Sequence, residues 1–199
     1  MKKHVLPLLI LAFIFFTSCN KTPDKIISIN PDELTAEDQV KIGQAFQLAL
    51  ENNSDDFVIL DSSDYPGANA YVTRLFYTML NTAQVQHRQD FDWSVHILHD
   101  DEVRTAFFLP GGHFYVYTGL LKFLDAESEL LGVIGHELYY VDSDLLVDRI
   151  RQQFGGVMLG DILLGNEVHE LTKYAAAMPY LDFESEKVTE ADSFSVDLI

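Results

Sequence analysis

The stretch that most constrains the fold is residues 125–142, which read as one helix carrying Gly-His-Glu-Leu-Tyr-Tyr at residues 135–140. His136 and Glu137 match the first two positions of the helical zinc motif H-E-x-x-H. In the intact motif, residues i and i+4 share a helix face, so two imidazoles reach one ion while the glutamate polarises its water. Here the second imidazole is missing, because the position four residues after His136 holds Tyr140.

The composition indicates a globular and strongly acidic protein. Of its 199 residues, 48% are hydrophobic, which is enough for one domain with a real core. The formal net charge is −18, from 13 basic and 31 acidic residues. Such a surface repels nucleic acid and anionic lipid headgroups, so we expect no nucleic-acid partner.

The N-terminus reads as a targeting segment, separate from the fold. A basic start is followed by an apolar run, Val5–Phe16, and by small residues before Cys19, the only cysteine of the chain. This order resembles a bacterial lipoprotein leader, with residues 1–18 removed, Cys19 lipidated, and residues 19–34 forming a tether. An ordinary signal peptide and an uncleaved anchor remain open alternatives.

The remaining sequence, residues 35–199, predicts one mainly helical α+β domain. A small antiparallel sheet is expected to pack beside the helix that bears His136 and Glu137. That helix should begin at an N-cap on Asp125 and run to about Gln153. The apolar run 157–164 is expected to be buried core. The other expected elements are helices over about 35–52, 68–86, 119–124, 167–178 and 189–199, and strands over 93–98, 103–109 and 113–118.

Three blocks together resemble one family. They are residues 105–121, residues 127–137 and the Glu-Ala-Asp of residues 190–192. They look like the zinc metallopeptidases of the type I CAAX prenyl endopeptidases, the heat-shock peptidase HtpX and the periplasmic peptidase BepA. The resemblance implies a polypeptide substrate or client that adds as a further strand to the strand after Pro-Gly-Gly. The residues of that strand here are His113, Phe114, Tyr115, Val116 and Tyr117.

The resemblance also implies roles for residues of the site. His136 matches the first zinc ligand, and Glu137 matches the general base that activates zinc-bound water. Tyr140 stands at the second ligand position. The family's third ligand is a glutamate four residues before a supporting aspartate, which is Asp192 here, so that position holds Val188. Zinc, if bound at all, would lack two of its three protein ligands, and the protein could have no cofactor.

Other side chains offer alternatives to this ligand set. Asp142, Asp144, Glu186 and Glu190 supply carboxylates near the two altered positions. Asp144 is two helical turns beyond His136, however, and Glu190 should point away from Val188 around its helix. A simpler alternative is that His136 and Glu137 are polar residues hydrogen-bonded to Tyr140 and Asp192.

The sequence therefore leads to one main expectation and two alternatives. The first is a membrane-tethered lipoprotein of the bacterial cell envelope, on the periplasmic or surface side, with an impaired or lost zinc site and a polypeptide-binding cleft. The second is an active metal-dependent endopeptidase with a non-standard ligand set. The third is a structural envelope lipoprotein. The sequence ends at Ile199, inside the last expected helix, where the family continues, so a longer natural chain is also expected.

Overall fold

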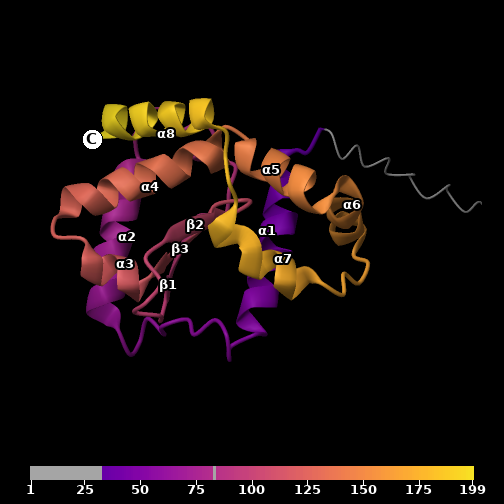
Figure 1. Cartoon of the computed structure of the whole chain (residues 1–199), viewed down its shortest axis with the longest axis horizontal. Helices are drawn as coiled ribbons and strands as arrows, with labels where there is room; N and C mark the ends of the chain where they lie inside the picture. The colour runs from indigo at the N-terminus through magenta and orange to yellow at the C-terminus, as the bar shows by residue number, and fades with distance from the viewer. Residues whose placement is uncertain (1–32, 83) are drawn as a thin grey trace, which may run out of the picture.

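The computed structural model describes residues 33–82 and 84–199 (Figure 1). The expected leader, Cys19 and the tether up to residue 32 lie outside this range. The elements are α1 (Ala36–Glu51), α2 (Pro66–Leu80), β1 (Ser94–Leu98), β2 (Ala106–Leu109), β3 (His113–Tyr117), α3 (Thr118–Phe123), α4 (Glu127–Asp142), α5 (Leu145–Phe154), α6 (Gly156–Leu164), α7 (Leu171–Ala177), the 3-10 turn η1 (Met178–Tyr180) and α8 (Ser185–Leu198). The expected mainly helical α+β domain is confirmed.

The sheet is mixed, with strand order β1-β3-β2. β2 and β3 pair antiparallel across the tight turn at residues 110–112, as expected. β1 pairs parallel with β3, so the expectation of a purely antiparallel sheet is wrong for this pair. The alternation of side chains predicts a strand but not its neighbour, and here β3 inserts between the two strands that precede it.

Helices cover both faces of the sheet. Figure 1 shows the sheet in the middle of the molecule, with α2 on one side and α1 on the other. On the α2 side, Phe76 stacks on Phe114 with ring centroids 5.7 Å apart. On the α1 side, the helix approaches so closely that a Cβ on Gly43 would lie 1.8 Å from the carbonyl oxygen of Pro110. α1 begins at the expected capping box, in which Thr35 and Asp38 bond each other's backbone.

The central helix is shorter than expected at both ends. The carboxylate of Glu129 accepts hydrogen bonds from the backbone N–H groups of Asp125 and Ala126, so Asp125 is not the N-cap. At the other end, α4 stops at Asp142 and α5 begins at Leu145, which corrects the expected continuous helix to Gln153.

The break between α4 and α5 is held by polar contacts that the helical pattern does not reveal. Asp144 has a left-handed backbone, with φ 61°, and its carboxylate accepts a hydrogen bond of 2.6 Å from Gln39 of α1. The buried carboxylate of Asp142 accepts the backbone N–H groups of Gln86 and His87 at 2.9 and 2.8 Å. These contacts tie the break to α1 and to the loop before β1.

The apolar run 157–164 is not buried core as expected. It forms α6 at the edge of the molecule (Figure 1). Met158 and Leu159 are buried against the core, but Val157 is 81% exposed and Leu164 is 61% exposed. Among the described helices, none is both long enough and apolar enough to cross a bilayer.

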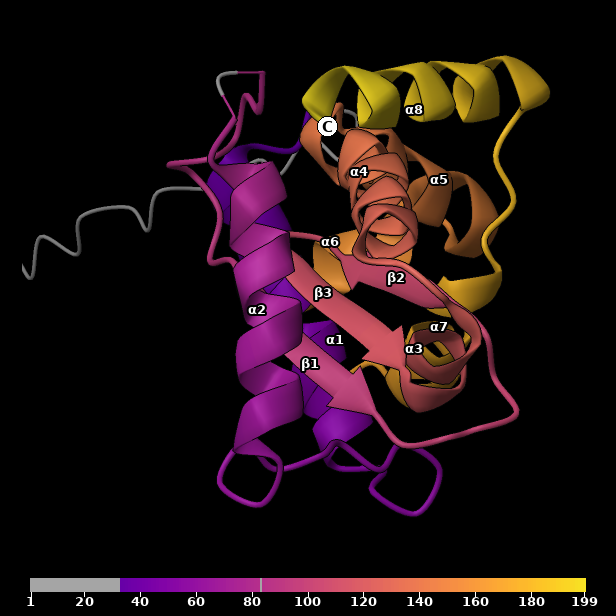
Figure 2. The ribbon, with the colours of Figure 1, turned by 90° about the vertical axis from the view of Figure 1, so that its left-hand side faces the viewer.

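α8 lies across α4, as Figures 1 and 2 both show. Small residues allow the close approach: a Cβ on Gly135 would lie 3.0 Å from the Cα of Ser195. The hydroxyl of Ser195 donates to the carbonyl of Gly132 at 2.8 Å. This packing brings the Glu-Ala-Asp block of α8 next to His136, about fifty residues earlier in the chain.

Candidate functional site

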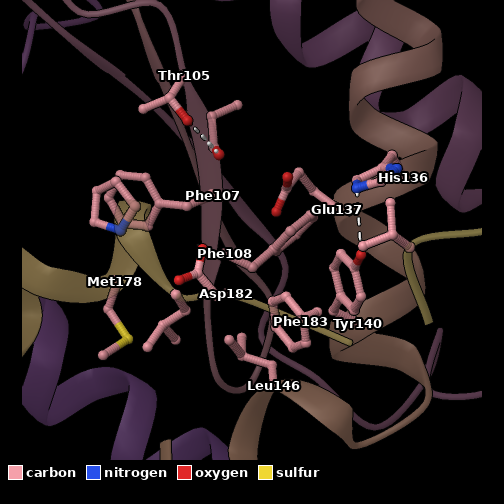
Figure 3. Close-up of a pocket in the computed structure, with 14 residues that line it drawn as sticks. Thr105, Phe107, Phe108, His136, Glu137, Tyr140, Leu146, Met178, Asp182 and Phe183 are labelled. Carbon is pink, nitrogen blue, oxygen red and sulfur yellow. Dashed lines mark hydrogen bonds between the residues drawn. The ribbon is translucent and has the colours of Figure 1, made fainter. Parts of the chain in front are cut away.

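A cavity of about 250 Å³ opens beside the histidine–glutamate pair (Figure 3). Its walls come from α4, from β2, from the start of α5 and α8, and from the segment between α7 and α8. The lining residues are Thr105, Ala106, Phe107, Phe108, His136, Glu137, Tyr140, Leu146, Met178, Pro179, Leu181, Asp182, Phe183 and Val188.

His136 is fixed from both sides of its ring. Its Nδ1 lies 2.8 Å from a carboxylate oxygen of Asp192. A carboxylate accepts, so we assign the ring proton to Nδ1, which leaves the lone pair on Nε2. The hydroxyl of Tyr140 donates toward that lone pair at 3.4 Å, a long contact drawn in Figure 3. The polar alternative from the sequence therefore describes the contacts of His136.

Glu137 lies in the cavity wall beside His136. Glu137 is half-buried, and the burial of its carboxyl group raises its pKa to about 8. Its carboxyl group has no hydrogen-bond or ion-pair partner in the part of the chain that the structure describes. The raised pKa favours the neutral carboxylic acid, which can donate a hydrogen bond into the cavity.

Tyr140 is a neutral phenol held in place by an aromatic stack. Its ring lies 3.7 Å from that of Phe183, centroid to centroid, with 10° between the planes. Burial, followed by the negative charges of Glu137 and Asp192, raises the pKa of Tyr140 to about 12. Metal ligation by tyrosine needs the phenolate, which this environment disfavours.

Val188 lines the same cavity as His136 and Tyr140. The three positions that the resemblance assigns to zinc ligands therefore surround one space, although Val188 lies far from the other two in sequence. Valine has no donor atom, so a single imidazole faces a phenol and an isopropyl group.

Three of the four alternative carboxylates, those of Asp142, Asp144 and Glu190, have other partners. Asp142 and Asp144 hold the break between α4 and α5, and Glu190 bonds Lys187 and the hydroxyl of Tyr139. Within residues 33–82 and 84–199, no three His, Cys, Asp or Glu side chains lie close enough to hold a metal ion. These residues do not fit a zinc ion with three protein ligands.

The strand expected to receive a substrate cannot do so. β3 is paired on both sides, and all five of its side chains are buried. His113 bonds Ser94 through Nδ1 at 2.8 Å, and burial lowers its pKa to about 4. The expectation that His113, Phe114, Tyr115, Val116 and Tyr117 form the substrate strand is therefore wrong, because the central place in the sheet leaves no free backbone edge.

β2 is the strand whose free edge faces the cavity. The carbonyl of Thr105 accepts a hydrogen bond from the N–H of Tyr117. In an antiparallel pair, the backbone groups of every second residue point toward the neighbouring strand, so this bond shows which residues of β2 face β3. The N–H and C=O groups of Ala106 and Phe108 therefore point away from β3. The hydroxyl of Thr105 donates to the Ala106 carbonyl at 3.3 Å. Ala106 and Phe108 both line the cavity, so an extended polypeptide could pair there.

Sequence reasoning missed the wall formed by Leu146, Met178, Leu181, Asp182 and Phe183. These residues lie in a short 3-10 turn, an irregular segment and the start of α5. No motif marks them, and only the packing of the chain brings them to His136.

A helix that presents histidine and glutamate to a cleft beside a free strand edge defines a metallopeptidase-like domain. Residues 66–161 match the model of peptidase family M48. The expected resemblance to the zinc metallopeptidases is therefore confirmed. The match ends before Val188 and Asp192, so their place in the site rests on the tertiary structure.

Two relatives carry the name mitochondrial metalloendopeptidase OMA1. The protein of Arabidopsis thaliana is 27% identical over 118 residues, which are 59% of this chain and 24% of the relative. That of Schizosaccharomyces pombe is 32% identical over 73 residues, which are 37% of this chain and 20% of the relative. The chain thus aligns with a quarter or less of each relative's length.

Proposed function

We propose that this protein is a metallopeptidase-like module that holds extended polypeptide in its cleft and has lost the zinc site. One observation carries the proposal. The lone pair of His136 faces the hydroxyl of Tyr140 at 3.4 Å, and Val188 lines the same cavity where a third ligand would be needed. Zinc with one protein ligand would bind weakly.

The cleft retains the parts that polypeptide binding needs. The free edge of β2 offers backbone donors and acceptors at Ala106 and Phe108, which recognise any extended chain without reading its sequence. The neutral carboxyl group of Glu137 could donate a hydrogen bond to a peptide carbonyl. Apolar side chains of Leu146, Met178 and Phe183 would contact the bound side chains.

Peptide hydrolysis with a non-standard ligand set is the second candidate. The orientation of His136 favours it, because the bond from Nδ1 to Asp192 leaves Nε2 facing the cavity, as a metal-binding imidazole requires. The residues at the ligand positions argue against this candidate, because Tyr140 is a neutral phenol and Val188 has no donor atom.

The restoring double change Tyr140→His with Val188→Glu tests the lost-site proposal. We expect the natural chain to retain almost no zinc after dialysis, and the double variant to retain about one zinc per chain, because three donors then surround one space. Elemental analysis measures both. Adding His136→Ala to the double variant should abolish the gain.

Two results would contradict the proposal. One is a natural chain that holds about one zinc and loses it on His136→Ala. The other is peptide cleavage by the natural chain that stops when a chelator is added.

We also propose that the module is tethered to a membrane of the bacterial cell envelope through a lipid on Cys19. The order of basic, apolar and small residues before this single cysteine supports the tether.

A further inference from the structure

We propose that Asp182 is a specificity residue, which selects a lysine or arginine side chain in the polypeptide held by the cleft. The inference rests on the proposed function and adds to it the chemical class of the client, a basic polypeptide segment. The observation behind this inference is that the carboxylate of Asp182 stands among apolar side chains of the cavity wall.

Asp182 is an isolated charge in the cavity wall. Its neighbours in the wall include Leu146, Met178, Leu181 and Phe183, all of them apolar. Figure 3 shows Asp182 across the cavity from His136 and Tyr140, close to β2. Within the described residues, Asp182 forms no ion pair or hydrogen bond. It is exposed at the rim and therefore accessible to a ligand.

A basic side chain fits this combination better than the other classes. Lysine and arginine have apolar stems that can lie along apolar walls while the charged end stays at the wet rim. The charged end would then donate a charge-assisted hydrogen bond to Asp182. An aliphatic side chain would cover the carboxylate without a partner, and an acidic one would be repelled.

The surrounding charges favour the same ligand. Arg149 and Asp182 both line a smaller adjoining cavity, but they form no ion pair. Lys187, which also lines it, is already paired with Glu190. The carboxylate of Asp182 thus keeps its charge available. The net charge of −18 adds a long-range field that attracts basic segments toward the protein.

Binding of matched peptides to the full chain tests the inference. Fluorescence anisotropy would compare extended peptides that differ at one central position, which carries lysine, norleucine or glutamate. We expect the lysine peptide to bind about 5-fold more tightly than the norleucine peptide, which is typical of a surface ion pair. The glutamate peptide should bind more weakly than both. The lysine advantage should shrink from low to high salt because the pair is exposed.

Asp182→Asn should remove the lysine advantage, because the amide carries no charge to pair with lysine. Glu184→Gln is the matched control, because this acid lies two residues further on and does not line the cavity. It should keep the advantage. Equal binding of the lysine and norleucine peptides, or an advantage that survives Asp182→Asn, would overturn the inference while the proposed cleft function stands. If no peptide binds, both fail.

Discussion

At the scale of single residues, hydrogen bonds order the side chains of the site. Asp192 fixes the ring of His136, and the hydroxyl of Tyr140 lies 3.4 Å from the other ring nitrogen. Among the residues that the structure describes, Glu137 has no partner for a negative charge, and burial raises its pKa to about 8. In the neutral form that burial favours, the carboxyl group of Glu137 could donate a hydrogen bond to a ligand.

Glu137 contributes to the pH dependence of stability. Its pKa is about 8 in the folded chain and 4.5 ordinarily, so the folded state binds this proton more tightly. The contribution of Glu137 to stability is therefore present at low pH and is lost as pH rises from about 4.5 to about 8. Glu137→Gln removes this loss.

We expect Glu137→Gln to gain stability relative to the natural chain, by on the order of 2 kcal/mol, between pH 5 and pH 8. Urea unfolding at the two pH values measures it. Glu186→Gln, an exposed acid on α8, is the control and should show no such gain. Parallel pH profiles for Glu137→Gln and the natural chain would show that Glu137 is ionised in the folded protein.

At the scale of elements, close approaches between segments build the cleft. α8 lies across α4 at Gly135 and brings Asp192 and Val188 to His136. α1 approaches the β2–β3 turn at Gly43, which holds the sheet in place under α4. The free edge of β2 faces the cleft because β3 occupies the centre of the sheet.

A pair of glycine substitutions tests the approach of α1. In Gly43→Ala the new methyl group would meet the backbone of Pro110 at 1.8 Å, and backbone cannot move aside cheaply. We expect a loss of about 2–4 kcal/mol in unfolding free energy. Gly160→Ala, inside α6 with open space around it, should instead gain about 0.5–1 kcal/mol from helix propensity. Urea unfolding of both variants checks the contrast, and a neutral Gly43→Ala would mean that α1 does not pack this closely.

At the scale of the whole molecule, an acidic domain is joined to an apolar N-terminal run. The net charge of −18 keeps the domain away from anionic surfaces, so the domain itself offers little attraction to a membrane. Membrane attachment would then depend on the proposed lipid at Cys19.

Cys19→Ser tests the tether. We expect the natural chain, expressed in a bacterial host, to incorporate labelled palmitate and to sediment with membranes. The variant should lose the label, because the chain has no other cysteine. Fractionation and autoradiography measure both. A natural chain without label would contradict the lipid anchor, and the cleft proposals would be unaffected.

The sequence by itself determined the local features. Capping residues predicted the start of α1, and the helical period predicted α2 and the helix that carries His136 and Glu137. The change at Tyr140 was also readable, because residues four apart on a helix share a face whatever surrounds them. Strand segments were recognisable from alternation, and each became a strand of the sheet.

Only the tertiary structure decided the rest, because it depends on contacts between segments far apart in the chain. The pairing order placed β3 in the centre of the sheet and β2 at its edge. The helix α6 lies at the surface although its residues are mostly apolar. Polar contacts from α1 and from the loop before β1 ended α4 early. The approach of α8 to α4 set Val188 into the same cavity as His136, and the segment before α8 supplied Asp182 to its wall. Local periodicity carries no information about such neighbours.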